Sequence, residues 1–183
     1  MALPEQSAES ADLLPGQLTV TTAAGLRAFG HRLGAMLRAG DLVLLTGPLG
    51  AGKTTLVQGL GAALGVRGPV TSPTFVIARV HPSLTGGPSL VHVDAYRLGG
   101  LAEVDDLDLD LSGSVTVVEW GEGLAEGLSA DRLEITIGFA ERHAGPVAEP
   151  GAGAAVPATD EPRVVTLRRT GARWAVPGAV AAT

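Results

Sequence analysis

Apolar residues are distributed along the chain in patterns that predict strands. Residues 42–45 and 115–118 are uninterrupted aliphatic runs, which are typical of parallel strands buried on both faces. Residues 133–137 and 163–169 alternate between apolar and polar side chains, as strands with one exposed face do. Shorter runs predict three more strands, at 18–20, 75–80 and 90–93. The loop HPSLTGGPS separates the last two of these and predicts that they pair antiparallel.

Two other segments carry apolar residues at helical spacing. The first follows a capping threonine, Thr21 or Thr22, and is expected to end at Gly40. Its apolar face consists of Leu26, Phe29, Gly30, Leu33 and Leu37. The second helix is expected to end at Gly65, and its apolar face consists of Leu56, Val57, Leu60, Ala63 and Leu64. Residues 101–111 mix leucines with carboxylates and predict a short helix or a turn.

Between the aliphatic strand at 42–45 and the second helix the chain reads GPLGAGKTT, which fits the phosphate-loop pattern G-x-x-x-x-G-K-[ST] in full. Glycines permit the positive φ angles and the close backbone approach that a turn around phosphate needs. Lys53 is expected to bridge the β- and γ-phosphate oxygens of ATP, and the Thr54 hydroxyl to ligate Mg²⁺. The expected nucleotide contacts come from Leu49, Gly50, Ala51, Gly52, Lys53, Thr54 and Thr55.

The composition supports a special role for the lysine of this loop. Lys53 is the only lysine among the 13 basic residues, and the other 12 are arginines. A chain that otherwise uses arginine keeps a lysine where a broad planar guanidinium cannot replace a compact ammonium. The formal net charge of −6 argues against a broad surface for nucleic acid. The absence of cysteine excludes disulfides and thiolate zinc sites.

Two of the predicted strands run into a carboxylate. The run LVHV is followed by Asp94, and the run VTVV by Glu119. A phosphate-loop site needs a carboxylate at a strand end to hold the magnesium shell, although each acid alone is also compatible with a solvated loop. The sequence leaves open which of the two activates the attacking water. The candidate catalytic residues are Lys53, Asp94 and Glu119, and the candidate metal ligands are Thr54, Asp94 and Glu119.

Several polar residues near these acids have two interpretations. Residues 71–74, TSPT, are compatible with a switch that senses the γ-phosphate, but their spacing alone slightly favours a proline turn that starts a strand. Arg97 is compatible with neutralising phosphate charge or with pairing a surface acid. Trp120 is expected in the core or at an interface. The four histidines show no metal-ligand spacing.

Strands mixed with helices around a phosphate loop predict an α/β protein with a single P-loop NTPase-like domain. Its central sheet is expected to be mainly parallel, with antiparallel edge strands and flanking helices. The domain is expected to span 18–183, after a disordered leader at 1–17, and to contain a low-complexity insertion at 144–160. No signal-like start and no run of about 18 apolar residues are present, which predicts a soluble cytoplasmic protein without membrane contact.

Three classes of P-loop protein compete at this point. A GTPase needs the guanine-reading pattern N-K-x-D, and this chain has no asparagine and one lysine. A small-molecule kinase needs an arginine-rich lid and an acceptor site, and residues 141–163 carry few arginines. A small ATPase whose hydrolysis drives a partner fits a minimal site best. The kinase remains the alternative.

Four motifs in this order, GPLGAGKTT, TSPTF, HVDAYRL and VEWGE, resemble those of the TsaE (YjeE) family. The resemblance runs from about residue 18 to residue 137, with a weaker echo at 163–174. Members of this family are ATPases of the bacterial machinery that makes threonylcarbamoyladenosine (t6A) at position 37 of tRNA. The leader and the segment at 144–160 depart from the family pattern.

The resemblance implies a Mg²⁺-dependent ATP hydrolase that binds TsaD-like and TsaB-like proteins and reaches tRNA only indirectly through that complex. It implies that Thr54 and Glu119 ligate magnesium, directly or through water, and that Asp94 is a second essential acid. It also implies that residues 71–74 form the switch segment and that Thr22 lies near the adenine of ATP.

Overall fold

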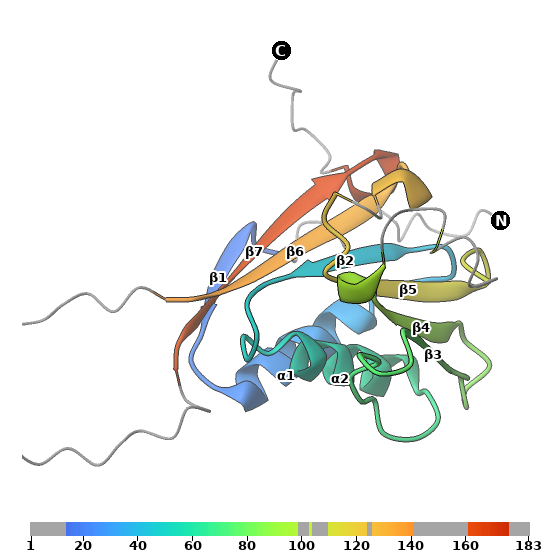
Figure 1. Ribbon diagram of the computed structural model, residues 1–183, viewed down its shortest axis with the longest axis horizontal. Helices are drawn as coiled ribbons and strands as arrows, with labels where there is room; N and C mark the ends of the chain where they lie inside the picture. The colour runs from blue at the N-terminus through green and yellow to red at the C-terminus, as the bar shows by residue number, and fades with distance from the viewer. Residues whose placement is uncertain (1–13, 99–102, 104–109, 124–125, 141–160, 176–183) are drawn as a thin grey trace, which may run out of the picture.

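The computed structural model describes residues 14–98, 103, 110–123, 126–140 and 161–175 (Figure 1). Within them a seven-stranded sheet forms one layer and two α-helices form a second. The strands are β1 (Gln17–Val20), β2 (Leu42–Thr46), β3 (Ala78–His81), β4 (Ser89–Asp94), β5 (Ser114–Glu119), β6 (Arg132–Phe139) and β7 (Arg163–Thr170). The helices are α1 (Ala23–Gly34) and α2 (Lys53–Leu64), with short 3-10 turns η2 (Ala95–Arg97), η3 (Glu126–Leu128) and η5 (Ala172–Trp174).

The sheet is mainly parallel at its centre and antiparallel at its edges. Its strand order is β1-β7-β6-β2-β5-β4-β3, and the pairs β6–β2, β2–β5 and β5–β4 are parallel. The pairs β1–β7, β7–β6 and β4–β3 are antiparallel. This arrangement confirms the predicted α/β fold class. It also brings the carboxyl ends of β2, β4 and β5 to one edge, where parallel α/β sheets place their ligands.

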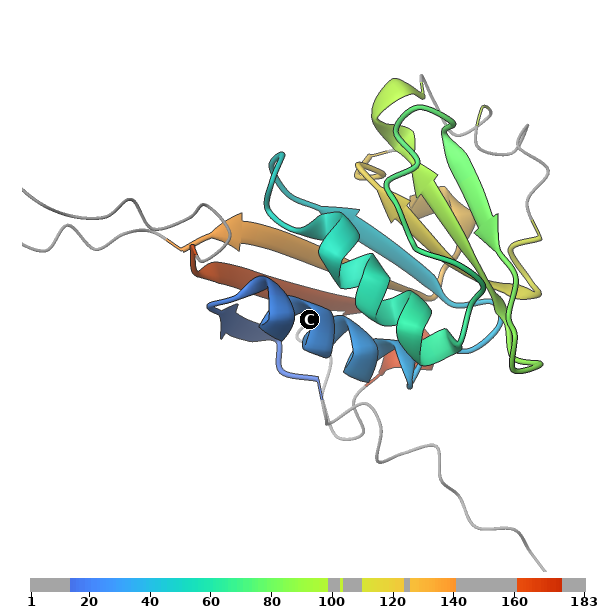
Figure 2. The ribbon, with the colours of Figure 1, turned by 90° about the horizontal axis from the view of Figure 1, so that it is seen from below.

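Helices α1 and α2 lie side by side on the same face of the sheet (Figure 2). Glycines at their contact permit an unusually close approach of the two backbones. A Cβ atom added to Gly30 would lie 2.2 Å from the Leu56 carbonyl oxygen, and one added to Gly59 would lie 2.1 Å from the Arg27 carbonyl oxygen. Since α2 begins directly at the glycine-rich loop, this packing fixes the position of that loop relative to α1.

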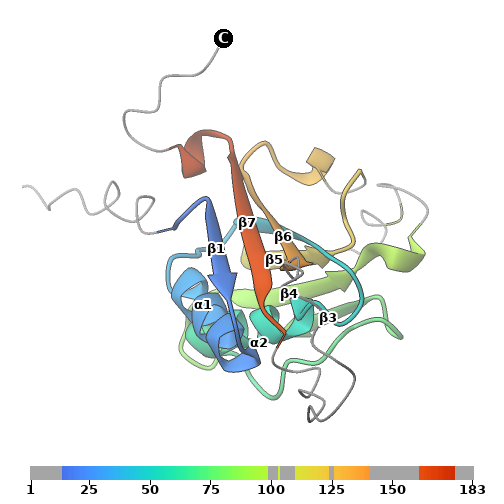
Figure 3. The ribbon, with the colours of Figure 1, turned by 90° about the vertical axis from the view of Figure 1, so that its left-hand side faces the viewer.

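The main core lies between the sheet and the helices and is built from Leu, Val and Ile with Phe29 and Trp174. The opposite face of the sheet carries a smaller apolar cluster of six buried residues, which Leu98 and Leu128 partly cover. Figure 3 shows β7 between β1 and β6, with β1 beside α1. The hairpin of β6 and β7 is closed by a hydrogen bond from the Ala140 amide to the Pro162 carbonyl, 2.9 Å long.

Two predicted boundaries were wrong. The strand expected at 75–80 begins only at Ala78, because the amides of Val76 and Ile77 both donate to the Pro73 carbonyl and form a turn. The φ angle of Ile77 is +67°, which is incompatible with a strand. The first helix ends at Gly34 rather than Gly40.

The structure describes the ends of the chain and its long connections only in part. The predicted leader reaches residue 17, yet Leu14 is already buried and β1 begins at Gln17, so the domain starts earlier than predicted. Residues 1–13, the predicted insertion at 144–160 and most of 101–111 lie outside the described residues. In the part of the chain that is described, no helix is both long and apolar enough to cross a membrane.

Candidate functional site

The glycine-rich loop joins the end of β2 to the start of α2. Gly52 is the N-cap of α2 and has a φ angle of +106°, which residues other than glycine rarely adopt. A Cβ at this position would also lie 2.5 Å from Cδ2 of Leu26 on α1. The tip of the loop is open to solvent, since Leu49 is 91% exposed. The loop therefore has the strand–turn–helix context that the phosphate-loop pattern predicted.

Lys53 is the first residue of α2, and its side chain is buried behind the loop. Its Nζ donates to the carbonyl oxygens of Gly47 at 2.7 Å and Pro48 at 3.2 Å. The ammonium also lies 4.0 Å from the centre of the Trp120 ring, a cation–π contact. Burial lowers the pKa of Lys53, and the nearby charges of Glu119 and Asp94 oppose this shift. Trp120, which was expected in the core or at an interface, is partly buried and lines the site.

Glu119 ends β5 and reaches the helix start from the neighbouring strand. Its Oε1 lies 3.2 Å from the Thr54 hydroxyl and 2.8 Å from Nε2 of His92. The carboxylate is nearly inaccessible, with Glu119 only 3% exposed. The end of β5 thus places this acid beside the threonine of the phosphate loop.

Asp94 ends β4 and ties the preceding TSPT segment to the sheet. Its Oδ2 accepts a hydrogen bond of 2.5 Å from the Thr74 hydroxyl, which also lies 2.7 Å from the Ser72 hydroxyl. Its Oδ1 accepts from the Tyr96 amide at 3.0 Å. The turn at residues 71–74 is therefore linked directly to one of the two candidate acids.

These groups surround a single cavity of about 320 Å³ at the carboxyl edge of the sheet. The residues that line it are Leu49, Gly50, Gly52, Lys53, Thr54, Thr55, Ser72, Thr74, Asp94, Glu119 and Trp120. Most of the residues predicted from the sequence to contact the nucleotide or the metal thus line the same cavity.

Three other candidates lie elsewhere. Ala51 is fully buried within the loop. Thr22 caps α1, and its hydroxyl accepts from the Gly25 amide at 3.0 Å. The Arg97 guanidinium lies over the exposed ring of Phe75, 5.7 Å from its centre.

The donor atoms of the cavity fit magnesium better than a softer metal. Thr54, Asp94 and Glu119 offer only hydroxyl and carboxylate oxygens, which are the ligands that Mg²⁺ prefers. Mg²⁺ at nucleotide sites usually takes one or two protein oxygens and completes its shell with water and phosphate. Among the described residues no group of three or more His, Cys, Asp and Glu side chains is clustered as a metal cage.

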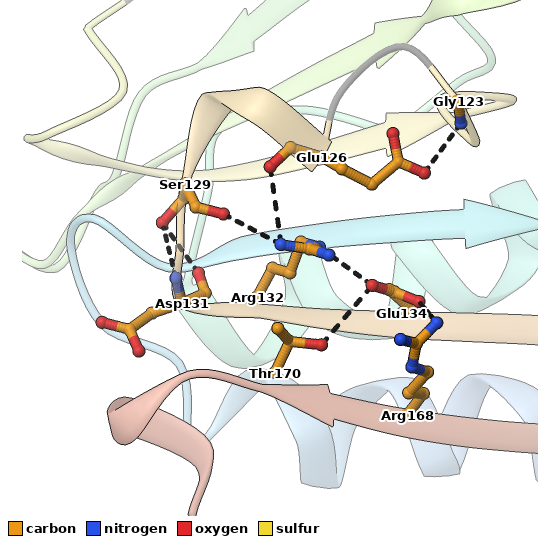
Figure 4. Close-up of polar contacts among 8 residues, drawn as sticks. All are labelled: Gly123, Glu126, Ser129, Asp131, Arg132, Glu134, Arg168 and Thr170. Atoms are coloured by element: carbon orange, nitrogen blue, oxygen red, sulfur yellow. Dashed lines mark hydrogen bonds and ion pairs between the residues drawn. The ribbon is translucent and has the colours of Figure 1, made fainter.

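The chain that follows Trp120 is fastened to β6 by a polar network (Figure 4). The Gly123 amide donates to Oε1 of Glu126 at 2.7 Å. Arg132 on β6 donates from Nη1 to the carbonyls of Glu126 and Ser129, at 3.5 and 3.3 Å. Its Nε donates to Glu134 at 2.9 Å. This network restrains the segment leading away from the cavity wall, and nothing in the sequence pattern indicated it.

The contact of His92 with Glu119 was not predicted from the sequence, in which the histidines were considered only as metal ligands. The signal was present in the motif HVDAYRL. Side chains alternate along a strand, so His92 and Asp94 share one face of β4. Asp94 pairs with Glu119 in the parallel register of β4 and β5, which places His92 beside the same acid.

The fold and the loop at the carboxyl edge define a P-loop NTPase-like α/β protein. A family model described as "Threonylcarbamoyl adenosine biosynthesis protein TsaE" matches residues 20–144, and the chain belongs to this family. A protein of Streptomyces coelicolor named "tRNA threonylcarbamoyladenosine biosynthesis protein TsaE" is 61% identical over 153 residues, 82% of this chain and 94% of the relative.

Two further comparisons agree. A protein of the same name from Mycobacterium bovis is 56% identical over 117 residues, 59% of this chain and 70% of the relative. The crystal structure of YdiB from Bacillus subtilis superposes with a TM-score of 0.63 at 28% identity, over 86% of this chain and 87% of that one. Similarity of this extent supports the fold along nearly its whole length.

Proposed function

We propose that this chain is a Mg²⁺-dependent ATPase that binds TsaD-like and TsaB-like proteins and supports t6A formation at position 37 of tRNA. The observation that carries the proposal is the convergence of Lys53, Thr54, Asp94 and Glu119 on one cavity beside a glycine-rich helix start. Membership of the TsaE family, whose description names threonylcarbamoyl adenosine biosynthesis, supports the pathway. This role would place the protein in the cytoplasm, in contact with tRNA only through its partners.

ATP would bind with its phosphates on residues 49–55. The Lys53 ammonium donates hydrogen bonds to two carbonyl oxygens of the loop. On nucleotide binding it would donate to β- and γ-phosphate oxygens in their place. Amides at the start of α2 would point at the same phosphates, where the helix dipole favours negative charge. Thr22, at the start of α1, is the proposed contact to the adenine.

Thr54 and Glu119 are the proposed magnesium ligands, with Asp94 nearby, and the ion would neutralise charge that develops on the phosphates. The chain's own carboxylates would orient the attacking water. Asp94 already accepts hydrogen bonds at both oxygens, whereas Glu119 accepts at Oε1. Which of them activates the water is the question that matched variants of the two acids address.

The rim of the cavity supports docking of a protein partner. Three apolar side chains beside it are largely exposed: Leu49 at 91%, Phe75 at 86% and Tyr96 at 71%. Exposed apolar side chains gathered around a polar site are typical of protein interfaces. No arginine lines the described wall of the cavity, which supports slow hydrolysis by the chain alone and faster hydrolysis when a partner completes the site.

The test is phosphate release from Mg·ATP by the purified chain, first alone and then with the TsaD–TsaB pair and no small-molecule acceptor. A low rate that the pair raises supports the proposal, and the Lys53→Ala variant reports the background. Equal rates with and without the pair contradict partner stimulation. A rate that ignores the pair but rises with a small hydroxyl-bearing metabolite would establish the alternative, a small-molecule kinase.

A further inference from the structure

His92 is the one fully buried histidine of the described chain, and it contacts a site carboxylate. It lies on β4 with 0% exposure, and its Nε2 is 2.8 Å from Oε1 of Glu119. A carboxylate oxygen accepts hydrogen bonds, and the imidazole tautomer with its hydrogen on Nε2 donates to it. Among the described residues the second ring nitrogen, Nδ1, has no hydrogen-bond partner.

A role in packing alone does not explain this residue. The position lies between Leu90 and Asp94 on one face of β4, beside a core built mainly from aliphatic side chains. A buried imidazole with one unpartnered nitrogen costs free energy that a leucine or valine at the same position would not. Packing against aliphatic neighbours therefore does not account for the polar ring, whose one hydrogen bond within the described part of the chain is the one to Glu119.

The bond restricts the side chain through which Glu119 reaches the phosphate loop. The Thr54 hydroxyl, on α2, and the His92 imidazole, on β4, are both within hydrogen-bond distance of the same oxygen of Glu119, Oε1. Two donors on one oxygen fix the rotation of the carboxylate, and no bond is present on Oε2 within the described part of the chain. Glu119 thus lines the cavity with both of these bonds on one of its two oxygens.

We propose that His92 is a positioning residue, which orients the Glu119 carboxylate so that it can serve the Mg·nucleotide. This inference rests on the proposed function, because it assigns a task to the supporting shell of the same site. Hydrogen-bond partners behind a metal ligand fix the orientation of that ligand, and their loss typically lowers metal affinity by about 10- to 100-fold. His92 would act through Glu119 and not touch the nucleotide.

The test compares binding of a non-hydrolysable ATP analogue with Mg²⁺ and with EDTA, by calorimetry on the full chain. In His92→Leu the gain in affinity that Mg²⁺ provides should shrink by about 10- to 100-fold, whereas the affinity in EDTA should stay within about 2-fold of wild type. His92→Gln should restore most of the gain, because its amide can donate to Oε1. His92→Asn should not, since its side chain is shorter.

The control is His81→Leu, which removes another buried histidine, on the neighbouring strand β3, that makes no bond to Glu119. It should leave both affinities unchanged. Equal loss of affinity with Mg²⁺ and with EDTA, or a full Mg²⁺ gain in His92→Leu, would overturn the inference and assign His92 to packing. If His92→Leu does not fold, the Gln and Asn variants decide. Wild-type binding that ignores Mg²⁺ would instead overturn the proposed function itself.

Discussion

The parallel strands have a buried carboxylate beside a cavity at their amino ends (the amino edge) and another at their carboxyl ends (the carboxyl edge). The two cavities are similar in size, but the two carboxylates have different hydrogen-bond partners. At the amino ends of β2 and β5, Asp41 is 5% exposed and lies beside a cavity of about 310 Å³. Arg173 donates to both of its oxygens at 3.1 Å, and the Arg38 amide donates at 2.9 Å. At the carboxyl ends, Glu119 is 3% exposed and is held by a hydroxyl and an imidazole.

The difference separates a carboxylate that stabilises the fold from one that is available to a ligand. The guanidinium of Arg173 neutralises Asp41 and occupies both of its oxygens in a bidentate pair, so little capacity for a cation remains. Thr54 and His92 occupy one oxygen of Glu119, and no arginine lines the described wall of its cavity. We therefore expect changes at the carboxyl edge to affect catalysis and changes at the amino edge to affect stability.

Lys53→Ala should have the largest effect. Removing the ammonium that would neutralise developing phosphate charge should lower turnover by about 10³-fold or more. Phosphate release under saturating Mg·ATP measures this, and calorimetry measures the accompanying loss of binding. Lys53→Arg should fail as well, because the guanidinium is too broad for the space between Gly47 and Trp120. Full activity of the arginine variant would contradict this interpretation of the solitary lysine.

Glu119→Gln should lower turnover by about 10²- to 10³-fold while the fold persists, because the amide keeps the shape of the side chain and removes its charge. Turnover is measured with the partner pair present, and thermal unfolding serves as the control. Asp94→Asn is the matched variant at the neighbouring strand end. The acid whose loss lowers turnover more at equal nucleotide affinity is the one that orients the water. Unfolding of Glu119→Gln would assign this residue to stability instead.

Arg173→Met should affect stability and not catalysis. It leaves Asp41 buried without its guanidinium, which should cost about 2–3 kcal/mol of unfolding free energy, less than a fully buried pair because Arg173 is 20% exposed. The methionine retains part of the contact with Trp174. Urea unfolding measures the change, and turnover per folded molecule should equal that of wild type. A lowered turnover at full folding would show that the two edges are coupled.

The smallest effect should be a pH dependence of stability at the carboxyl edge. Burial lowers the pKa of Lys53 below its ordinary value of 10.5, so the folded state binds fewer protons than the unfolded state between these two pKa values. The cost of burying the ammonium is fully present below the folded pKa and is relieved as pH rises toward 10.5. The unfolding free energy of wild type relative to Lys53→Met should therefore rise with pH in this window. A flat or falling difference would contradict the shift.

The sequence predicted the parts of this site that depend on local pattern. The phosphate loop follows from a complete motif, and Asp94 and Glu119 follow from aliphatic runs that end in an acid. The strand at 75–80 was predicted wrongly because Phe75 and Val76 favour strands, whereas the chain uses them in an exposed turn closed on Pro73.

Other features depend on contacts between distant segments. The bond between His92 and Glu119 joins residues 27 positions apart, and the contact of Lys53 with Trp120 joins α2 to the end of β5. The Asp41–Arg173 pair spans 132 positions. In each of these pairs the two residues belong to different segments of the fold, so periodicity and spacing within one segment cannot identify the contact. They become visible only when the order of strands in the sheet is known.

The hydrogen bond between Ala140 and Pro162 has a practical consequence for work with this protein. It joins residues directly after β6 and directly before β7, so the two points between which any connection of these strands must run lie next to each other. Lengthening a connection whose ends are already pinned costs only about 0.6 kcal/mol for each doubling of its length. The β6–β7 junction is therefore the natural place to insert an affinity tag or a fluorescent reporter.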